Sequence, residues 1–298
     1  QLQAAGESRT QDELIEAFGV RLAGEGTLPL HAGGRRLLET AANHSFAVVH
    51  NLAAVDGVVE APIEISVFLS CGLHLVGHVS DDSAILWARV PVPGTYTLEV
   101  TGPGDAKAKR SFHAVARESE DWCLRWEVSE LKANVTYHYR IARASKILWE
   151  GRDFIFKTAP KTDEPVEVTL AFGSCANFES SSIWTRIKTE GTDGVVLLGD
   201  TPYIDVTDLD RVHDAYRRFS SIPTLSETFR SIPFWGTWDD HDFGGNDSDG
   251  TLPGKENSRE GFIHYRPNAT FGRNDKGIYT KFRYGPIEVF LLDTRWFS

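Results

Sequence analysis

The strongest constraint on the fold is a regular alternation of short apolar runs and helical stretches in the second half of the chain. The apolar runs cover residues 166–175, 194–200 and 233–240, and the helical stretches cover 181–191 and 209–222. An alternation of strands and helices is typical of an α/β domain built on one sheet. We therefore predict an α/β domain that follows the polar linker at residues 161–165.

The first half of the chain has a different pattern. Short runs with alternating apolar and polar residues are separated by Gly and Pro, which is typical of an antiparallel β-sandwich. These runs cover residues 84–91, 94–100, 124–131, 135–142 and 153–160. Residues 1–70 are expected to form an N-terminal extension, with an amphipathic helix at 11–23 and a strand at 63–69.

Composition excludes several classes of protein. The chain has 298 residues and a net charge of -11, which argues against binding to a nucleic-acid backbone. No apolar run reaches 18 residues, so no transmembrane segment is expected. The three cysteines, Cys71, Cys123 and Cys175, include no C-x-x-C pair and allow at most one disulfide. An acidic protein that acts on phosphates needs metal ions to offset its own charge.

Each apolar run of the second half ends in a residue that can bind a metal ion. These residues are Cys175 after the first run, Asp200 after the second, and Asp239, Asp240, His241 and Asp242 after the third. Because consecutive strands often lie side by side, we expect the side chains to converge on one edge of the sheet. Crowded carboxylates raise one another's pKa unless cations lie between them. The sequence therefore predicts a metal site.

Each of these residues is also compatible with a purely structural role. Gly-Asp dipeptides start turns and Asp caps helices, so Asp200 alone is weak evidence. The acidic run around Asp240 fits a solvated loop, and His241 fits an imidazole bound to a backbone carbonyl. Cys175 fits a small buried apolar residue. The coincidence of three strand ends favours the metal site over these alternatives.

Longer motifs extend through most of the chain. They are FGSCAN, LLGDTPYID, AYRRF, WDDHDFGGND and GIYTKFRYGPIEVFLLDTRWF, preceded by SAILWARVP and TYHYRI…FKTAP. Together they resemble the PhoD-like alkaline phosphatase/phosphodiesterase family of the calcineurin-like metallophosphoesterase superfamily, over about residues 74–298. The resemblance implies a fibronectin- or Ig-like β-sandwich at 71–160. It also implies a calcineurin-like α/β domain of layered sheets with flanking helices, of which 161–298 would be the N-terminal part.

The resemblance further implies a set of ligands. Cys175, Asp200, Tyr216, Asp240 and Asn246 would bind metal, with Asp200 bridging two ions; Tyr216 is also compatible with a simple aromatic on a helix face. A thiolate beside oxygen ligands suits Fe(3+), and the oxygen of Asn246 suits Ca(2+), although other divalent metals fit as well. Tyr203, Asp205 and Asp239 would support the ligands or contact substrate.

The implied activity is metal-dependent hydrolysis of phosphate esters, as in alkaline phosphatases, phosphodiesterases and enzymes that cleave phospholipid head groups. A metal-bound hydroxide would attack phosphorus, and His241 would protonate or hydrogen-bond the leaving oxygen. The substrate would be a small phosphate ester. The alternative is a secreted binding module whose phosphatase domain is inactive.

Relatives in this family take further His and Asp ligands from a later Gly-Asp-x-His-type segment, which has no counterpart in this sequence. We therefore expect that the sequence is a truncated or processed part of a longer protein, or that a second polypeptide segment completes the active site. Family members are commonly exported, so a periplasmic, cell-surface or extracellular location is expected. Two N-glycosylation tripeptides, at 134–136 and 268–270, carry little weight because such tripeptides are common by chance.

Overall fold

A computed structural model describes residues 73–103, 109–179 and 181–298, together with the backbone of five short strands among the first 72 residues. The chain divides into two units, Gln1–Gly72 and Leu73–Ser298. In the part of the chain that is described, no helix has both the length and the apolar character needed to cross a bilayer.

The described strands of the first unit form two small antiparallel sheets. They are β1 (Ser8–Thr10), β2 (Val20–Leu22), β3 (Thr27–Pro29), β4 (Val48–Val49) and β5 (Ile65–Val67). Strand β1 pairs with β3, and β5 lies between β2 and β4. The strand expected at 63–69 is confirmed by β5. The helix expected at 11–23 is wrong at its end, because residues 20–22 pair with β5 as a strand; residues 11–19 lie outside the described residues.

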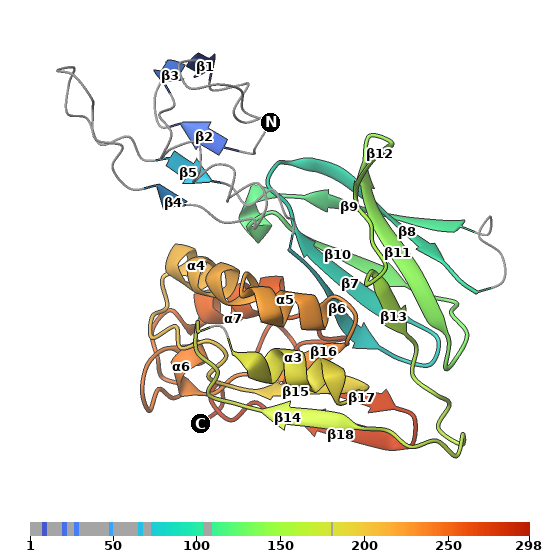
Figure 1. The fold of residues 1–298 in the computed structure, drawn as a ribbon. Helices are drawn as coiled ribbons and strands as arrows, with labels where there is room; N and C mark the ends of the chain where they lie inside the picture. The colour runs from blue at the N-terminus through green and yellow to red at the C-terminus, as the bar shows by residue number, and fades with distance from the viewer. Residues whose placement is uncertain are drawn as a thin grey trace. The chain divides into compact units, whose positions relative to one another are not determined.

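Two antiparallel sheets open the second unit (Figure 1). The three-stranded sheet has the order β10-β7-β6, and the five-stranded sheet has the order β12-β11-β8-β9 with β13 paired to β11. The strands are β6 (Leu73–Val79), β7 (Ala84–Arg89), β8 (Gly94–Thr101), β9 (Lys109–Ala116), β10 (Cys123–Val128), β11 (Thr136–Arg143), β12 (Lys146–Trp149) and β13 (Ile155–Lys157). A 3-10 turn at Glu118–Glu120 precedes β10.

The two sheets share one apolar core. In β8, Tyr96, Leu98 and Val100 are buried while the residues between them are not, as the period of a strand requires. Trp126 from β10 and Phe156 from β13 belong to the same core. All five alternating runs are therefore confirmed as strands, whereas β6, β9 and β12 were not predicted. The fibronectin-like assignment stays a prediction.

The α/β part begins with the parallel sheet β14-β15-β16 (Figure 1). Its strands are β14 (Leu170–Gly173), β15 (Gly194–Leu198) and β16 (Phe234–Thr237). Its helices are α3 (Ser182–Thr189), α4 (Leu209–Ser220), α5 (Pro223–Phe229), α6 (Asp240–Phe243) and α7 (Lys255–Tyr265). The predicted α/β alternation is confirmed, and α5, α6 and α7 are additions to it.

Local sequence explains where the main helices begin and which side they bury. The side chain of Asp208 accepts from the backbone N–H of Arg211 at the start of α4, and Ser181 caps α3 in the same way. In α4, Val212, Tyr216 and Phe219 recur at helical spacing and are buried in the core that the helices form on one face of the sheet.

The opposite face of the parallel sheet is covered by a hairpin. Its strands are β17 (Thr280–Tyr284) and β18 (Ile287–Leu291), and they pair antiparallel. Phe282 stacks on Trp235 of β16 with ring centroids 3.8 Å apart. Val196 and Leu291 complete this small core. The hairpin therefore begins a second layer over the sheet.

One buried carboxylate joins the antiparallel sheets to the helices. Asp121 accepts from Arg89 at 3.0 and 3.1 Å, from Arg217 of α4 at 3.0 and 3.1 Å, and from the hydroxyl of Tyr265 of α7. Despite its burial, these partners, Arg89 foremost, lower the pKa of Asp121 to about 2. These bonds to Asp121 hold α4 and α7 in place, and both helices pack on the helix-covered face of the parallel sheet.

Candidate metal centre

The carboxyl ends of the three parallel strands bring the predicted residues together. Cys175 follows β14 by two residues, Asp200 follows β15 by two, and Asp240 follows β16 by three. Because the strands are parallel and adjacent, these ends lie at one edge of the sheet. The register of the three strands therefore brings these residues to one edge, as expected.

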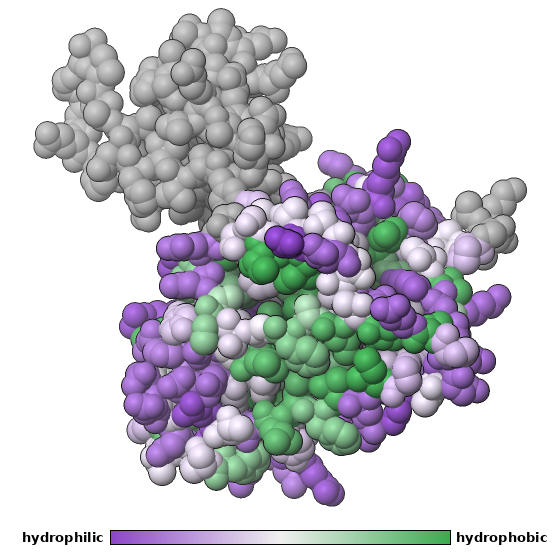
Figure 2. All heavy atoms as spheres, turned by 60° about the horizontal axis from the view of Figure 1, so that its bottom comes forward, coloured by the Kyte–Doolittle hydropathy of each residue, from purple (hydrophilic) through white to green (hydrophobic). Residues whose placement is uncertain are grey.

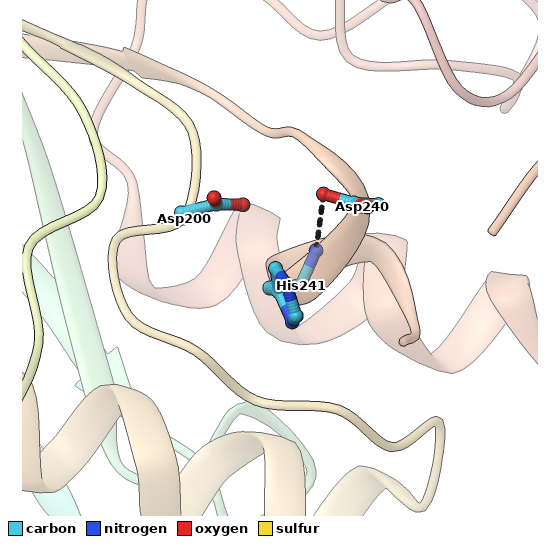
Figure 3. Close-up of side chains that lie close together, drawn as sticks. All are labelled: Asp200, Asp240 and His241. Atoms are coloured by element: carbon cyan, nitrogen blue, oxygen red, sulfur yellow. Dashed lines mark hydrogen bonds between the residues drawn. The ribbon is translucent and has the colours of Figure 1, made fainter. Parts of the chain in front are cut away.

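The closest group consists of Asp200, Asp240 and His241. One potential ligand atom from each lies within 4.8 Å of the others. Asp200 and Asp240 are buried and His241 is partly exposed. Figure 3 shows the two carboxylates facing each other, with the backbone N–H of His241 donating to Oδ1 of Asp240 at 3.2 Å. The arrangement offers two oxygens and a nitrogen to one small volume.

The surroundings of Asp200 indicate that a cation fits this group. Its Oδ2 accepts from the thiol of Cys175 at 3.5 Å, but its Oδ1 is buried and has no partner among the described residues. A buried carboxylate oxygen without a partner is costly. A bound cation removes that cost, and the thiolate and carboxylates around it are common metal ligands. Cys175 and Cys123 are free thiols, exposed and buried respectively, while Cys71 lies outside the described residues.

The backbone at the strand ends has left-handed geometry. Cys175, Asp200 and Asp205 have φ values of 57°, 53° and 58°, and Gly199 has φ 105°. A Cβ on Gly199 would lie 2.5 Å from the backbone nitrogen of Asp239, so only glycine allows the two strand ends to approach. Non-glycine residues in this region cost energy and concentrate at functional sites. This strain supports a functional role for the edge.

The phenol at this centre is Tyr203, and this corrects the assignment of Tyr216. The Tyr203 hydroxyl is hydrogen-bonded to Cys175, and this bond, with burial and the charges of Cys175 and Asp200, raises the pKa of Tyr203 to about 12. Tyr216 instead lies in the helical core, stacked on Tyr265 at 5.5 Å. Its hydroxyl is buried without a partner among the described residues. The helix-face alternative therefore describes Tyr216.

His241 is oriented by Asp205. The Nδ1 atom of His241 lies 2.5 Å from a carboxylate oxygen of Asp205. This hydrogen bond is the main reason that the pKa of His241 is raised, and the charges of Asp205, Asp200 and Asp240 add to it. The Tyr203 ring lies 4.4 Å from the imidazole. Asp205, predicted to lie near the centre, thus holds one nitrogen of His241 and leaves Nε2 available.

Asp240 keeps its charge although it is buried. Burial alone would raise its pKa, but the backbone N–H of Asp247, which donates at 2.7 Å, and the nearby Arg295 lower it. Arg295 also binds Asp239, at 2.5 Å, so Asp239 supports the centre through this arginine. Asn246 is exposed and donates its side-chain N–H to Asp247 at 2.7 Å. Its assignment as a calcium ligand stays a prediction.

The comparisons with known proteins agree with this geometry. No family model matches the chain. Alkaline phosphatase D from Bacillus subtilis (strain 168) is 25% identical over 272 residues, and the match covers 74% of this chain and 45% of that protein. The chain resembles the PhoD-like phosphatases. The resemblance seen in the motifs is thereby confirmed.

Two solved structures share the fold. The structure of PhoD has a TM-score of 0.65 and 22% identity, with 76% of this chain and 52% of that chain covered. The purple acid phosphatase PPD1 from yellow lupin (Lupinus luteus) seeds has a TM-score of 0.58 and 10% identity, with 79% and 48% covered. The calcineurin-like α/β fold is therefore shown. The chain spans about half the length of these PhoD-like relatives.

Two residues position the centre in ways that the sequence did not indicate: Asp242 was expected only among the possible ligands, and Arg295 was not singled out. Asp242 is buried and accepts from the backbone N–H groups of Asp239 at 2.6 Å and Thr201 at 3.3 Å, so it holds the β15 and β16 ends together. Burial raises its pKa to about 7. Arg295 reaches Asp239 across 56 residues of sequence. No local signal marks Arg295, whereas the spacing Asp239-x-x-Asp242 at a helix start was a readable sign of capping.

Proposed function

We propose that this protein hydrolyses phosphate esters with the help of metal ions held by Asp200 and Asp240, beside His241. The observation that carries the proposal is the unpartnered, buried Oδ1 of Asp200 within this group. The group lies at the carboxyl edge of a sheet in the fold that phosphatases share. The similarity to alkaline phosphatase D supports the same activity.

The donor set supports Fe(3+) together with Ca(2+). Cys175 and Tyr203 offer a thiolate and a phenolate on one side of Asp200, and such donors suit iron. Asp240 and Asn246 offer oxygens, which suit calcium. Asp200, which lies between the two sets, is the residue best placed to bind both ions.

Bound metal ions supply an activated water and neutralise charge on the phosphate. The chain itself supplies His241, whose Nδ1 is held by Asp205 at 2.5 Å. Because Asp205 accepts the Nδ1 proton, Nε2 of His241 carries a proton only in the imidazolium form, which the raised pKa of His241 favours. That proton points away from Asp205 and would pass to the leaving oxygen of the ester. Tyr203 packs against the imidazole and limits its rotation.

The substrate is a small phosphate monoester or diester, and phospholipid head groups belong to the same class. We also propose that the protein is exported and that a second polypeptide segment contributes further ligands. Both proposals follow from the resemblance to the PhoD-like family, which the similarity to alkaline phosphatase D supports. We propose in addition that residues 71–160 form a fibronectin-like domain, with the domain boundary at residue 160.

Metal content and turnover measured on the same sample test the proposal. We expect stoichiometric iron and calcium by elemental analysis, with hydrolysis of nitrophenyl phosphate or bis-nitrophenyl phosphate. Asp200→Asn should lose bound metal and at least 10²-fold in rate, because removing one charged partner of a buried ion is costly. Asp210→Asn, on the exposed side of α4, is the matched control. Unchanged metal content and turnover in Asp200→Asn would overturn the proposal.

A further inference from the structure

One arginine is buried next to the strand ends that form the metal centre. Arg266, which directly follows α7, is 1% exposed, and no other lysine or arginine is buried among the residues whose exposure the structure describes. On the side drawn in Figure 2, hydrophilic side chains, in purple, lie on the outside of the protein, where water solvates them. Burying a guanidinium, which stays charged at physiological pH, is costly unless other partners replace the water.

The packing of Arg266 directs its guanidinium to the carboxyl end of β15. Its side chain passes β16 at Gly236, where an added Cβ would lie 3.2 Å from Cδ and 3.3 Å from Nε of the arginine. The guanidinium carbon lies 4.9 Å from the ring centre of Tyr216 and 5.6 Å from that of Phe219, both in α4. Arg266 is thus enclosed between the sheet and α4, and its contact with the two rings offsets part of the cost of burial.

The end of the guanidinium binds the residue that follows Asp200. Nη2 of Arg266 donates to the backbone oxygen of Thr201 and lies 3.4 Å from the Thr201 hydroxyl. Thr201 is fully buried, and its backbone N–H donates to Asp242 at 3.3 Å. Both backbone groups of Thr201 are therefore held by buried side chains of opposite charge. Hydrogen bonds to charged groups are the stronger class.

Arg266 and Asp242 also compensate each other's charge. Burial raises the pKa of Asp242, while the backbone N–H of Asp239 and the charge of Arg266 oppose that rise. Burial lowers the pKa of Arg266, while Tyr216 and Asp242 oppose that change. Because Asp242 also accepts from the backbone N–H of Asp239 at 2.6 Å, the two charged groups together hold the ends of both β15 and β16.

We propose that Arg266 is a positioning residue for the metal centre, which fixes the backbone at Thr201 so that the carboxylate of Asp200 keeps its free oxygen available to metal ions. This role rests on the proposed function. Asp200 has a left-handed φ of 53°, its Oδ2 accepts from Cys175, and its Oδ1 has no partner among the described residues. Such an arrangement relaxes unless neighbouring groups hold it, and Arg266 supplies that support from the side of α4.

The field of the charge alone would have the opposite effect on metal binding. A positive charge near the centre repels cations, so its removal would tighten metal binding if Arg266 acted only through its field. A positioning role predicts weaker binding, because the carboxylate of Asp200 is then free to turn away from the metal. A purely structural role, in which Arg266 only ties α7 to β15, predicts a less stable fold with unchanged metal affinity of the folded protein.

Arg266→Met and Arg266→Lys separate these three roles. Affinities for Ca²⁺ and Fe³⁺ are measured by competition with a chelator, and the free energy of unfolding is measured in urea on the metal-free proteins. We expect Arg266→Met to bind metal roughly 100-fold more weakly than the wild type. Arg266→Lys keeps the charge, but its shorter side chain cannot stack on Tyr216 and reach Thr201 together, so we expect about tenfold weaker binding.

Arg259→Lys is the matched control. Arg259 of α7 also donates to backbone oxygens, at 2.8 Å to Gly277 and at 3.4 Å to Phe271, and neither acceptor belongs to the strand ends of the centre. This variant should keep the metal affinity of the wild type. If Arg266→Met fails to fold, Arg266→Lys provides the test by itself, because it retains the buried charge.

Unchanged or tighter metal binding by Arg266→Lys would overturn the positioning role and leave the proposed function standing. Equal losses of affinity in Arg266→Lys and Arg259→Lys would also overturn it, since the cause would then be a general loosening of α7. A wild-type protein that binds neither metal would overturn the proposed function, and with it this role of Arg266.

Discussion

At the scale of single residues, the centre separates groups that bind a metal ion from groups that hold them in place. Asp200 and Asp240 are buried, yet the hydrogen bonds around Asp240 come from backbone N–H groups and Arg295, while one oxygen of Asp200 has none. His241 and Tyr203 sit at the exposed side. Substitutions of Tyr203 and His241 test their roles.

Tyr203 and Tyr216 provide a matched pair. If iron binds beside Cys175, the phenolate of Tyr203 gives a visible charge-transfer band, since its hydroxyl is hydrogen-bonded to Cys175. Tyr203→Phe should abolish or shift the band, and Tyr216→Phe should leave it unchanged because Tyr216 lies in the helical core. Absorption spectra of the two iron-loaded variants show whether Tyr203 or Tyr216 binds the iron. The reverse pattern would restore Tyr216 as the ligand.

His241→Ala distinguishes a proton donor from a metal ligand. A general acid contributes roughly 10²–10⁴-fold, and its contribution grows as the leaving group becomes more basic. We therefore expect alkyl phosphates to be slowed much more than nitrophenyl phosphates. Rates for a series of leaving groups, with metal content measured on the same samples, provide the test. Uniform slowing with loss of metal would identify His241 as a ligand instead.

At the scale of elements, the centre depends on how closely the ends of β15 and β16 approach. Gly199 makes this approach possible, and Asp242 ties Thr201 to Asp239 through its carboxylate. Packing between elements also makes the tripeptide at 268–270 a poor glycosylation site. Asn268 is fully buried there, and its side chain hydrogen-bonds to the edge of β16. These features follow from pairing between elements that are distant in sequence.

Gly199→Ala should lower both stability and metal affinity. The added Cβ would meet the backbone of Asp239 at 2.5 Å, where nothing flexible can move aside, and φ is also positive. We expect a loss of about 1–3 kcal/mol in the free energy of unfolding. Gly191→Ala is the control, because its φ is 73° but no atom lies within 4 Å of the new Cβ. Urea unfolding of both variants measures the difference, and equal losses would contradict the close approach.

At the scale of the whole unit from Leu73 to Ser298, buried polar groups join the antiparallel sheets to the α/β part. Asp121 binds α4 and α7, and His78 of β6 accepts from the indole N–H of Trp235 in β16 at 3.0 Å. Because His78 must be neutral to accept this bond, the junction is sensitive to acid. Burial, with a smaller effect of Arg125, lowers the pKa of His78 to about 4, although Asp82 opposes this.

The pH dependence of stability follows from this shift. Between pH 6.5 and about 4 the unfolded chain binds a proton at His78 that the folded chain does not, so stability falls as pH falls. From pH 7 to pH 5, His78 should contribute about 2 kcal/mol to this loss. His78→Gln keeps an acceptor for Trp235 and should reduce the loss by that amount. Unfolding curves at both pH values measure it, and identical pH dependence in the two proteins would refute the role of His78.

The sequence by itself determined five strands of the antiparallel sheets, the alternation of strands and helices in the α/β part, and the types of residue at the strand ends. Alternating runs predicted five antiparallel strands, and the acids after residues 198 and 237 predicted a metal site, because side-chain period and turn composition are local properties. Sequence spacing also placed Asp200, Asp240 and His241 at the right edge.

Only the tertiary structure decided which phenol reaches the centre and which side chains support it. Tyr203 and Tyr216 are equally plausible by residue type, but the fold turns one towards Cys175 and buries the other against Tyr265. Arg295 reaches Asp239 only because β18 lies beside the parallel sheet. Contacts of this kind depend on how elements pack in space, and no local pattern in the chain encodes the packing of segments that are tens of residues apart.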